Sequence, residues 1–192
     1  MMAVALVVLT IAIYSASFDH RHAAKSVPTT ERIGDHAPEA VRGLLSFVDS
    51  MRAGGSAAGG RELAAVGVRH VAAALGAVAN STGLNIDAKL ETIREHATQI
   101  ERDPRSRERT AQARAAFRAL AVLFEAVQQA RFRGLGPDVA NVSRAASSLR
   151  PKYRLVDQDD VVQEFFIRAA SAIRAMNHEM SSPHQASDIS TA

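Results

Sequence analysis

Apolar residues recur three and four positions apart along most of the chain, which is the spacing of an amphipathic helix. The pattern predicts helices over about residues 38–53, 61–80, 86–102, 104–133, 137–150 and 158–180. Their apolar seams are Val41, Leu44, Val48 and Met51; Ala64, Val68, Val71, Leu75 and Val78; Ile86, Leu90, Ile93, Ala97 and Ile100; Ala113, Phe117, Leu120, Phe124 and Val127; Val139, Val142, Ala146 and Leu149; and Val162, Phe166, Ala169, Ile173 and Met176.

Turn and capping residues separate these helices. Glycines between residues 54 and 60 end the first helix. Asp103 followed by Pro104 predicts a helix start, because Asp accepts hydrogen bonds from first-turn amides and Pro loses no bond at the first helical position. Asp157, with Asp160 three residues later, resembles a capping arrangement for the last helix.

No segment alternates apolar and polar residues in the period of two that predicts a strand. The sequence therefore predicts an all-α protein. Within residues 38–180 we expect an antiparallel bundle of about four long helices plus one or two short helices, preceded by one N-terminal membrane-anchoring helix.

The anchoring helix is predicted from residues 1–18, which are mostly apolar and carry no charge. As a helix they would span roughly 27 Å, close to the thickness of the bilayer core. A cleaved signal peptide and a buried helix of a soluble domain are the alternatives, although a signal peptide normally begins with basic residues and none precedes Arg21. We expect residues 1–18 to be a transmembrane anchor or uncleaved signal, residues 19–37 a flexible tether, and residues 181–192 a disordered tail.

Composition excludes several classes of function. The chain has no cysteine, so it has no disulfide scaffold, thiolate zinc site or thiol nucleophile. Its formal net charge is only +3, which does not indicate nucleic-acid binding. It has no nucleophile-elbow motif, and the glycines near residues 54–60 lack the Lys-Ser/Thr ending of a phosphate loop. We expect a non-enzymatic protein without a cofactor.

Histidines and methionines are the only soft or imidazole ligands for a metal. His70 and His96 flank the seams of neighbouring helices and would approach each other in an antiparallel pair. A second group near the C-terminus is of the type that suits copper, although His178 projects away from the two methionines on a helix. Its members are Met176, His178, Met180 and His184. For both groups the interpretation as ordinary surface and core residues is favoured, so we predict no metal site.

A basic stretch between residues 131 and 154 holds six cations and one acid, Asp138. Its cations are Arg131, Arg133, Arg144, Arg150, Lys152 and Arg154. Such a stretch is either a solvated face or a contact with anionic lipid headgroups or an acidic partner surface.

Residues 44–132 resemble a helical domain family of unknown function found in bacterial periplasmic proteins and in metal-efflux adaptor proteins. The matching residues are Leu45, Asp49, Val71, Leu75, Ala113, Arg114, Ala116, Phe117, Leu120, Leu123 and Phe124. The resemblance implies a periplasmic helical bundle. It does not extend to the family's metal-associated tail, which is rich in Cys, Met and Trp, because this chain has neither Cys nor Trp.

These observations favour a membrane-anchored accessory or scaffolding subunit that docks on a larger bacterial membrane protein complex of respiratory, photosynthetic or transport type. Its expected partners are subunits of that complex, and membrane lipids through the N-terminal helix. The cations after the apolar segment favour a cytoplasmic body by the positive-inside rule, whereas the family resemblance favours a periplasmic one. We expect a single pass through the inner membrane with the body on the periplasmic side. A periplasmic metal-binding or sensing module is the alternative function.

Overall fold

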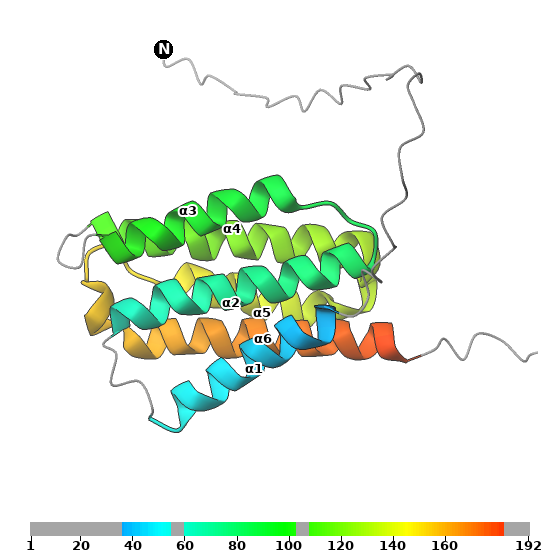
Figure 1. The fold of residues 1–192 in the computed structure, drawn as a ribbon. Helices are drawn as coiled ribbons and strands as arrows, with labels where there is room; N and C mark the ends of the chain where they lie inside the picture. The colour runs from blue at the N-terminus through cyan, green and yellow to red at the C-terminus, as the bar shows by residue number, and fades with distance from the viewer. Residues whose placement is uncertain (1–35, 55–59, 103–107, 183–192) are drawn as a thin grey trace, which may run out of the picture. The chain divides into compact units, whose positions relative to one another are not determined.

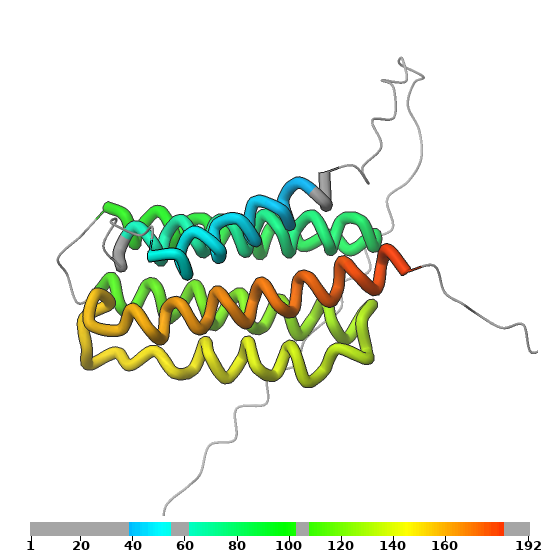
Figure 2. The backbone as a smooth tube through the Cα atoms, turned by 90° about the horizontal axis from the view of Figure 1, so that it is seen from below, coloured from blue at the N-terminus to red at the C-terminus, as the bar shows by residue number. Residues whose placement is uncertain are grey.

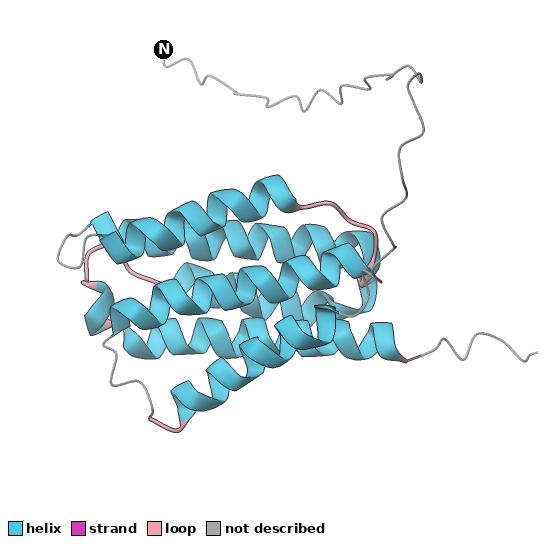
Figure 3. Ribbon diagram, viewed as in Figure 1, coloured by secondary structure: helices cyan, strands magenta, loops and turns pink. Residues whose placement is uncertain are grey.

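The computed structural model describes residues 36–54, 60–102 and 108–182, and every α-helix in these ranges belongs to one compact unit. Six α-helices are formed there: α1 (His36–Arg52), α2 (Gly60–Ser81), α3 (Asp87–Arg102), α4 (Glu108–Arg131), α5 (Gly136–Ser148) and α6 (Asp159–Ser181). Short 3-10 helices, η2 (Arg133–Leu135) and η3 (Leu155–Asp157), precede α5 and α6. No strand occurs in the described ranges (Figures 1 and 3), so the predicted all-α class is confirmed there.

Consecutive helices pack side by side and run in opposite directions (Figure 1). Figure 2 shows two layers, with α1, α2 and α3 in one and α4, α5 and α6 in the other. The layers are joined by contacts of α2 with α4 and α6, of α1 with α6, and of α3 with α4. Helix α2 thus contacts four other helices and forms the centre of the bundle.

The predicted seams form the core. Every seam residue from Val41 to Met176 is buried except Ile86, which is half-buried and packs against the core. The core is wider than the seams, because Leu123 in α4 and Phe165 in α6 are also buried. Helices in the middle of a bundle have neighbours on two sides, so a single stripe underestimates the face that they bury.

An aromatic cluster joins helices that are far apart in sequence. Phe117 of α4 stacks on Phe165 of α6, with ring centroids 4.0 Å apart. Phe166 lies edge-on to both rings, and also to Phe47 of α1, at centroid distances of 5.5 Å. The cluster therefore holds the first and last described helices against α4.

The prediction of about four long helices and one or two short ones corresponds to six α-helices: α2, α4 and α6 have 22, 24 and 23 residues, α1 and α3 have 17 and 16, and α5 has 13. One prediction about a helix end differs from the structure. The predicted cap at Asp157 is wrong. The N-cap of α6 is Gln158, with no side-chain cap bond, because Asp157 lies in η3 and pairs with Arg154.

Several predictions fall outside the described residues: the anchor at 1–18, all but the last two positions of the tether at 19–37, the start signal at Asp103, and nearly all of the tail at 181–192. Among the described residues, one helix is long and apolar enough to cross a membrane by length and composition. It is Glu62–Ser81 of α2, with a mean hydropathy of 1.4. Two thirds of that window is buried inside the bundle, as expected of the core helix of a helical domain.

Candidate functional site

The predicted basic stretch does not form one surface. Arg131 and Arg133 lie where α4 meets α5, whereas Arg150, Lys152 and Arg154 lie where α5 meets α6, at the opposite end of the bundle (Figure 1). The 13 residues of α5 separate the two groups by about 20 Å. Arg144 lies on α5 itself and donates a hydrogen bond to Asn141. All six cations are exposed, but no single flat partner or lipid surface is indicated by their placement.

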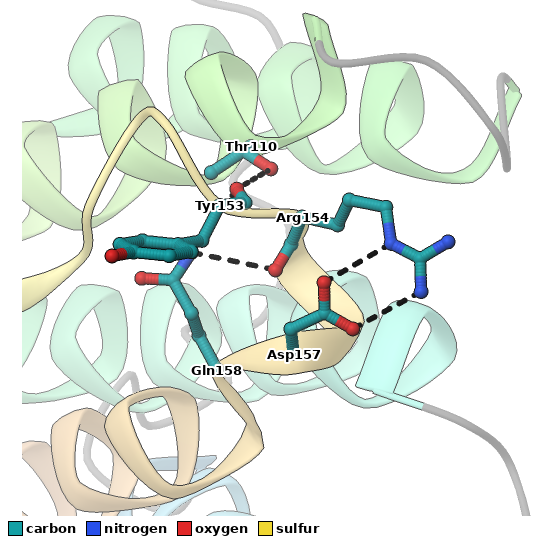
Figure 4. A network of polar contacts seen from close by, with 5 residues as sticks. All are labelled: Thr110, Tyr153, Arg154, Asp157 and Gln158. Carbon is teal, nitrogen blue, oxygen red and sulfur yellow. Dashed lines mark hydrogen bonds and ion pairs between the residues drawn. The ribbon is translucent and has the colours of Figure 1, made fainter.

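The connection between α5 and α6 is organised by the buried side chain of Gln158 (Figure 4), of which only 5% is exposed. Its amide nitrogen donates to the carbonyl oxygens of Arg150 and Tyr153, at 3.0 and 3.2 Å, and its oxygen accepts from the Arg150 amide at 2.8 Å. The hydroxyl of Thr110 in α4 donates to the same Tyr153 carbonyl at 3.2 Å. These bonds satisfy backbone groups that no helix pairs, so the network is structural.

Acidic side chains follow the cations at this end of the bundle. Arg154 donates to both carboxylate oxygens of Asp157 at 3.1 Å, and this contact lowers the pKa of Asp157. Partial burial, with the nearby charges of Asp160 and Asp157, raises the pKa of Asp159. The predicted basic stretch ends at residue 154 and so does not include these carboxylates, the first of which is Asp157. The end of the bundle is thus mixed in charge.

The two central histidines have different neighbours. The ring of His70 in α2 stacks on Phe47 of α1, with centroids 5.1 Å apart, and its burial lowers its pKa. His96 in α3 is instead hydrogen-bonded to Gln112 of α4, over 2.8 Å from Nδ1 to Oε1. Each ring thus has a partner on a helix that the other does not contact, and the predicted approach of His70 to His96 stays a prediction.

The C-terminal group is also dispersed. Met176 is buried in the core, Met180 is half-buried against it, and His178 is exposed. His184 lies outside the described residues. In the part of the chain that the structure describes, no three histidine, aspartate or glutamate side chains come together as metal ligands would.

A groove between α3 and α4 is the feature that sequence analysis missed. It has a volume of about 330 Å³. The residues that line it are Lys89, Thr92, Ile93, Arg118, Ala119, Val122 and Leu123. Val122 is 60% exposed, the largest exposed fraction among the large apolar residues in the described ranges. The sequence does contain a signal for this groove: Val122 is apolar, lies four residues after Arg118, and is outside the predicted seam of the 104–133 helix.

The charges of the groove have one sign. Lys89 and Arg118 are exposed, and neither forms an ion pair with another residue of the described ranges. Other cations on or against α3 are paired: Arg94 with Glu91, and Arg69 of α2 with Glu101 near the C-terminal end of α3. The latter pair raises the pKa of Arg69 and lowers that of Glu101. The groove thus combines an apolar floor with two unpaired cations.

Searches for similar proteins gave no match to a protein-family model, to a curated protein or to a solved structure. The resemblance of residues 44–132 to a periplasmic helical family therefore stays a prediction.

Proposed function

We propose that this chain is a membrane-anchored, non-enzymatic helical module that serves as an accessory or scaffolding subunit of a larger bacterial membrane complex. The uncharged residues 1–18 would anchor it in the inner membrane, and the helical body would stand on the periplasmic side and contact its partner.

The observation that carries this proposal is the exposed α3–α4 groove on a helical bundle whose core is packed with apolar side chains. Apolar side chains occupy the core of the described residues, and the buried side chains of Thr110 and Gln158 bond to the backbone of the α5–α6 connection. The groove instead presents apolar atoms and unpaired cations to solvent. An open apolar surface with a polar rim is typical of a protein–protein contact.

Membrane attachment is tested by fractionation of cells that express the full chain. We expect the protein in the membrane fraction, resistant to alkaline carbonate and released by detergent. A Val7→Arg/Leu9→Arg variant should move to the soluble fraction, because each charge inside a bilayer costs about 2.5–3.5 kcal/mol. A Lys25→Glu variant, changed outside the apolar run, is the matched control. Carbonate extraction of the unchanged protein would contradict the anchor.

Membership of a complex is tested in the same membranes. After extraction in mild detergent and chemical crosslinking, native electrophoresis should show the protein in a species larger than its own monomer, containing a defined membrane protein. Purification of the chain as a stable monomer, without a crosslinked membrane-protein partner, would refute the accessory-subunit function. The side of the membrane is read with single-cysteine variants, since the chain has no cysteine of its own.

A further inference from the structure

The groove between α3 and α4 is built from side chains on one face of each helix. On α3, Lys89 lies three and four residues before Thr92 and Ile93. On α4, Ala119 lies three and four residues before Val122 and Leu123, and Arg118 lies four residues before Val122. Ile93 and Leu123 are only 1% exposed and form the floor. Ala119 also lines the groove, and its side chain is the smallest in the lining.

The shape of the groove selects among ligands. Its volume of about 330 Å³ is near the lower limit of small-molecule pockets, which hold their ligands in enclosed clefts of about 300–1,000 Å³. Here Val122 stays 60% exposed, so a small ligand or an acyl chain lying on it would remain largely in water. A ligand that brings its own apolar face would cover Val122 together with the floor, as a helix does when it packs into a groove between two others.

The charge of the groove favours an acidic partner. Lys89 and Arg118 line the same concavity and repel each other, with no carboxylate paired to either in the described ranges. A partner with carboxylates beside its apolar side chain would neutralise both cations, whereas a basic partner would add repulsion. Strand addition is not an option for this surface, because α3 and α4 offer no sheet edge.

We propose that the α3–α4 groove binds an acidic amphipathic helix of a partner protein, with a large apolar side chain on Ala119 and Val122, above the buried Ile93 and Leu123, and carboxylates at Lys89 and Arg118. This inference rests on the proposed accessory function, and it names the surface and the chemistry of the partner.

The test uses the full chain in lipid nanodiscs and a random 16-residue peptide library displayed on phage, a length of about four helical turns. We expect selected peptides to share an apolar residue with Asp or Glu three or four positions away. The chosen peptides are then synthesised and their affinity is measured by fluorescence anisotropy. Selection of neutral or basic peptides, or no selection at all, would overturn the proposal.

Variants place the binding in the groove. Ala119→Leu fills the groove without changing charge and should weaken binding about tenfold, while Ala111→Leu, at an exposed position of the same helix, should leave it unchanged. Lys89→Glu/Arg118→Glu should lose the acidic peptides and gain versions in which Lys replaces each acid. Arg42→Glu/Arg174→Glu, two exposed cations on α1 and α6, is the charge control. If the groove variants and the control variants bound the acidic peptides with equal affinity, the α3–α4 groove would not be the binding site.

The outcome is separable from the proposed function. A chain that sits in a membrane complex but selects no acidic peptide would refute the groove and leave the accessory function in place. A chain that binds acidic peptides through the groove, yet is extracted by carbonate and forms no complex, would refute the accessory function alone. Binding of nanodiscs with anionic lipid in place of peptides, lost in Lys89→Glu/Arg118→Glu, would identify a lipid surface and overturn the peptide proposal.

Discussion

At the scale of single residues, Gly67 shows a requirement that helix propensity alone does not reveal. It lies in the middle of α2, where alanine would be favoured by about 1 kcal/mol. A Cβ atom there would lie 2.7 Å from Cε1 of the Phe166 ring and closer still to Cζ, and that ring is fixed in the aromatic cluster. We therefore expect Gly67→Ala to lower the free energy of unfolding by up to about 2 kcal/mol, because overpacking costs about 1–3 kcal/mol and the better helix propensity of alanine offsets about 1 kcal/mol of that.

The matched control for Gly67 is Gly43, in the interior of α1. A Cβ at Gly43 would lie 3.8 Å from Nδ1 of His70, which is an ordinary contact. Gly43→Ala should therefore raise stability by about 0.5–1 kcal/mol. Urea denaturation followed by circular dichroism measures both variants, and an equal effect of the two would show that Phe166 does not constrain position 67.

Gln158 is a second residue whose role depends on tertiary structure. Replacing it with alanine removes the partner of the Arg150 amide and of the Arg150 and Tyr153 carbonyls. We expect Gln158→Ala to cost about 1–3 kcal/mol of stability. Gln158→Glu should cost more at neutral pH, since a carboxylate cannot donate to carbonyl oxygens. Gln129→Ala, at an exposed position of α4, should change stability by no more than about 0.5 kcal/mol. Denaturant titration at pH 7 compares the three, and equal losses for all would remove the role of the network.

His70 predicts a pH dependence of stability. Burial against Phe47 lowers its pKa below the ordinary value of 6.5, so the unfolded chain binds the proton more readily than the folded one. The stability that the neutral ring contributes is complete above pH 6.5 and is lost as the pH falls from 6.5 through the lowered pKa. We expect the His70→Phe variant to keep this stability as the pH falls, because phenylalanine does not bind a proton. The measurement is the difference in unfolding free energy between variant and wild type at pH 7.5 and 5.5, and a difference that does not change with pH would contradict the assignment.

At the scale of elements, periodicity predicted the helices well, because each helix buries the face that its sequence marks as apolar. The seam of α1, from Val41 to Met51, is buried as expected. The cations of the basic stretch lie in two groups, because the 13 residues of α5 place Arg131 and Arg133 at one end of the bundle and Arg150, Lys152 and Arg154 at the other. The groove was missed because its lining comes from two helices, and no single helix shows it.

Helix α2 shows why apolar composition does not by itself indicate a membrane span. Because the chain has no cysteine, Ala73→Cys and Ala74→Cys each introduce a single thiol. Ala73 is exposed and Ala74 is fully buried in the bundle. In membranes opened to both aqueous sides, we expect a water-soluble maleimide to label position 73 readily and position 74 only after unfolding in urea. Protection of both positions until the membrane is dissolved in detergent would instead indicate that α2 crosses the bilayer.

At the scale of the whole molecule, contacts between consecutive helices explain most of the packing, but the bundle is closed by α6 against α1 and α2. This closure could not be predicted from periodicity, because seams do not specify which helices meet. The structure assigns part of it to Phe47 and Phe166, whose rings meet edge to face at an angle of 84°. Such a pair contributes about 0.5–1.5 kcal/mol beyond the area that it buries.

A double-mutant cycle measures that closure directly. Phe47→Leu and Phe166→Leu each keep an apolar side chain, so the coupling free energy between them reports the ring contact, and we expect about 0.5–1.5 kcal/mol. Phe47→Leu with Phe132→Leu is the control, because Phe132 is buried just after α4 and has no ring contact with Phe47 among those of the described residues. The control pair should be additive within about 0.5 kcal/mol. If the Phe47 and Phe166 losses were also additive, α1 would be held to α6 by burial alone, and the aromatic cluster would not couple the first and last described helices.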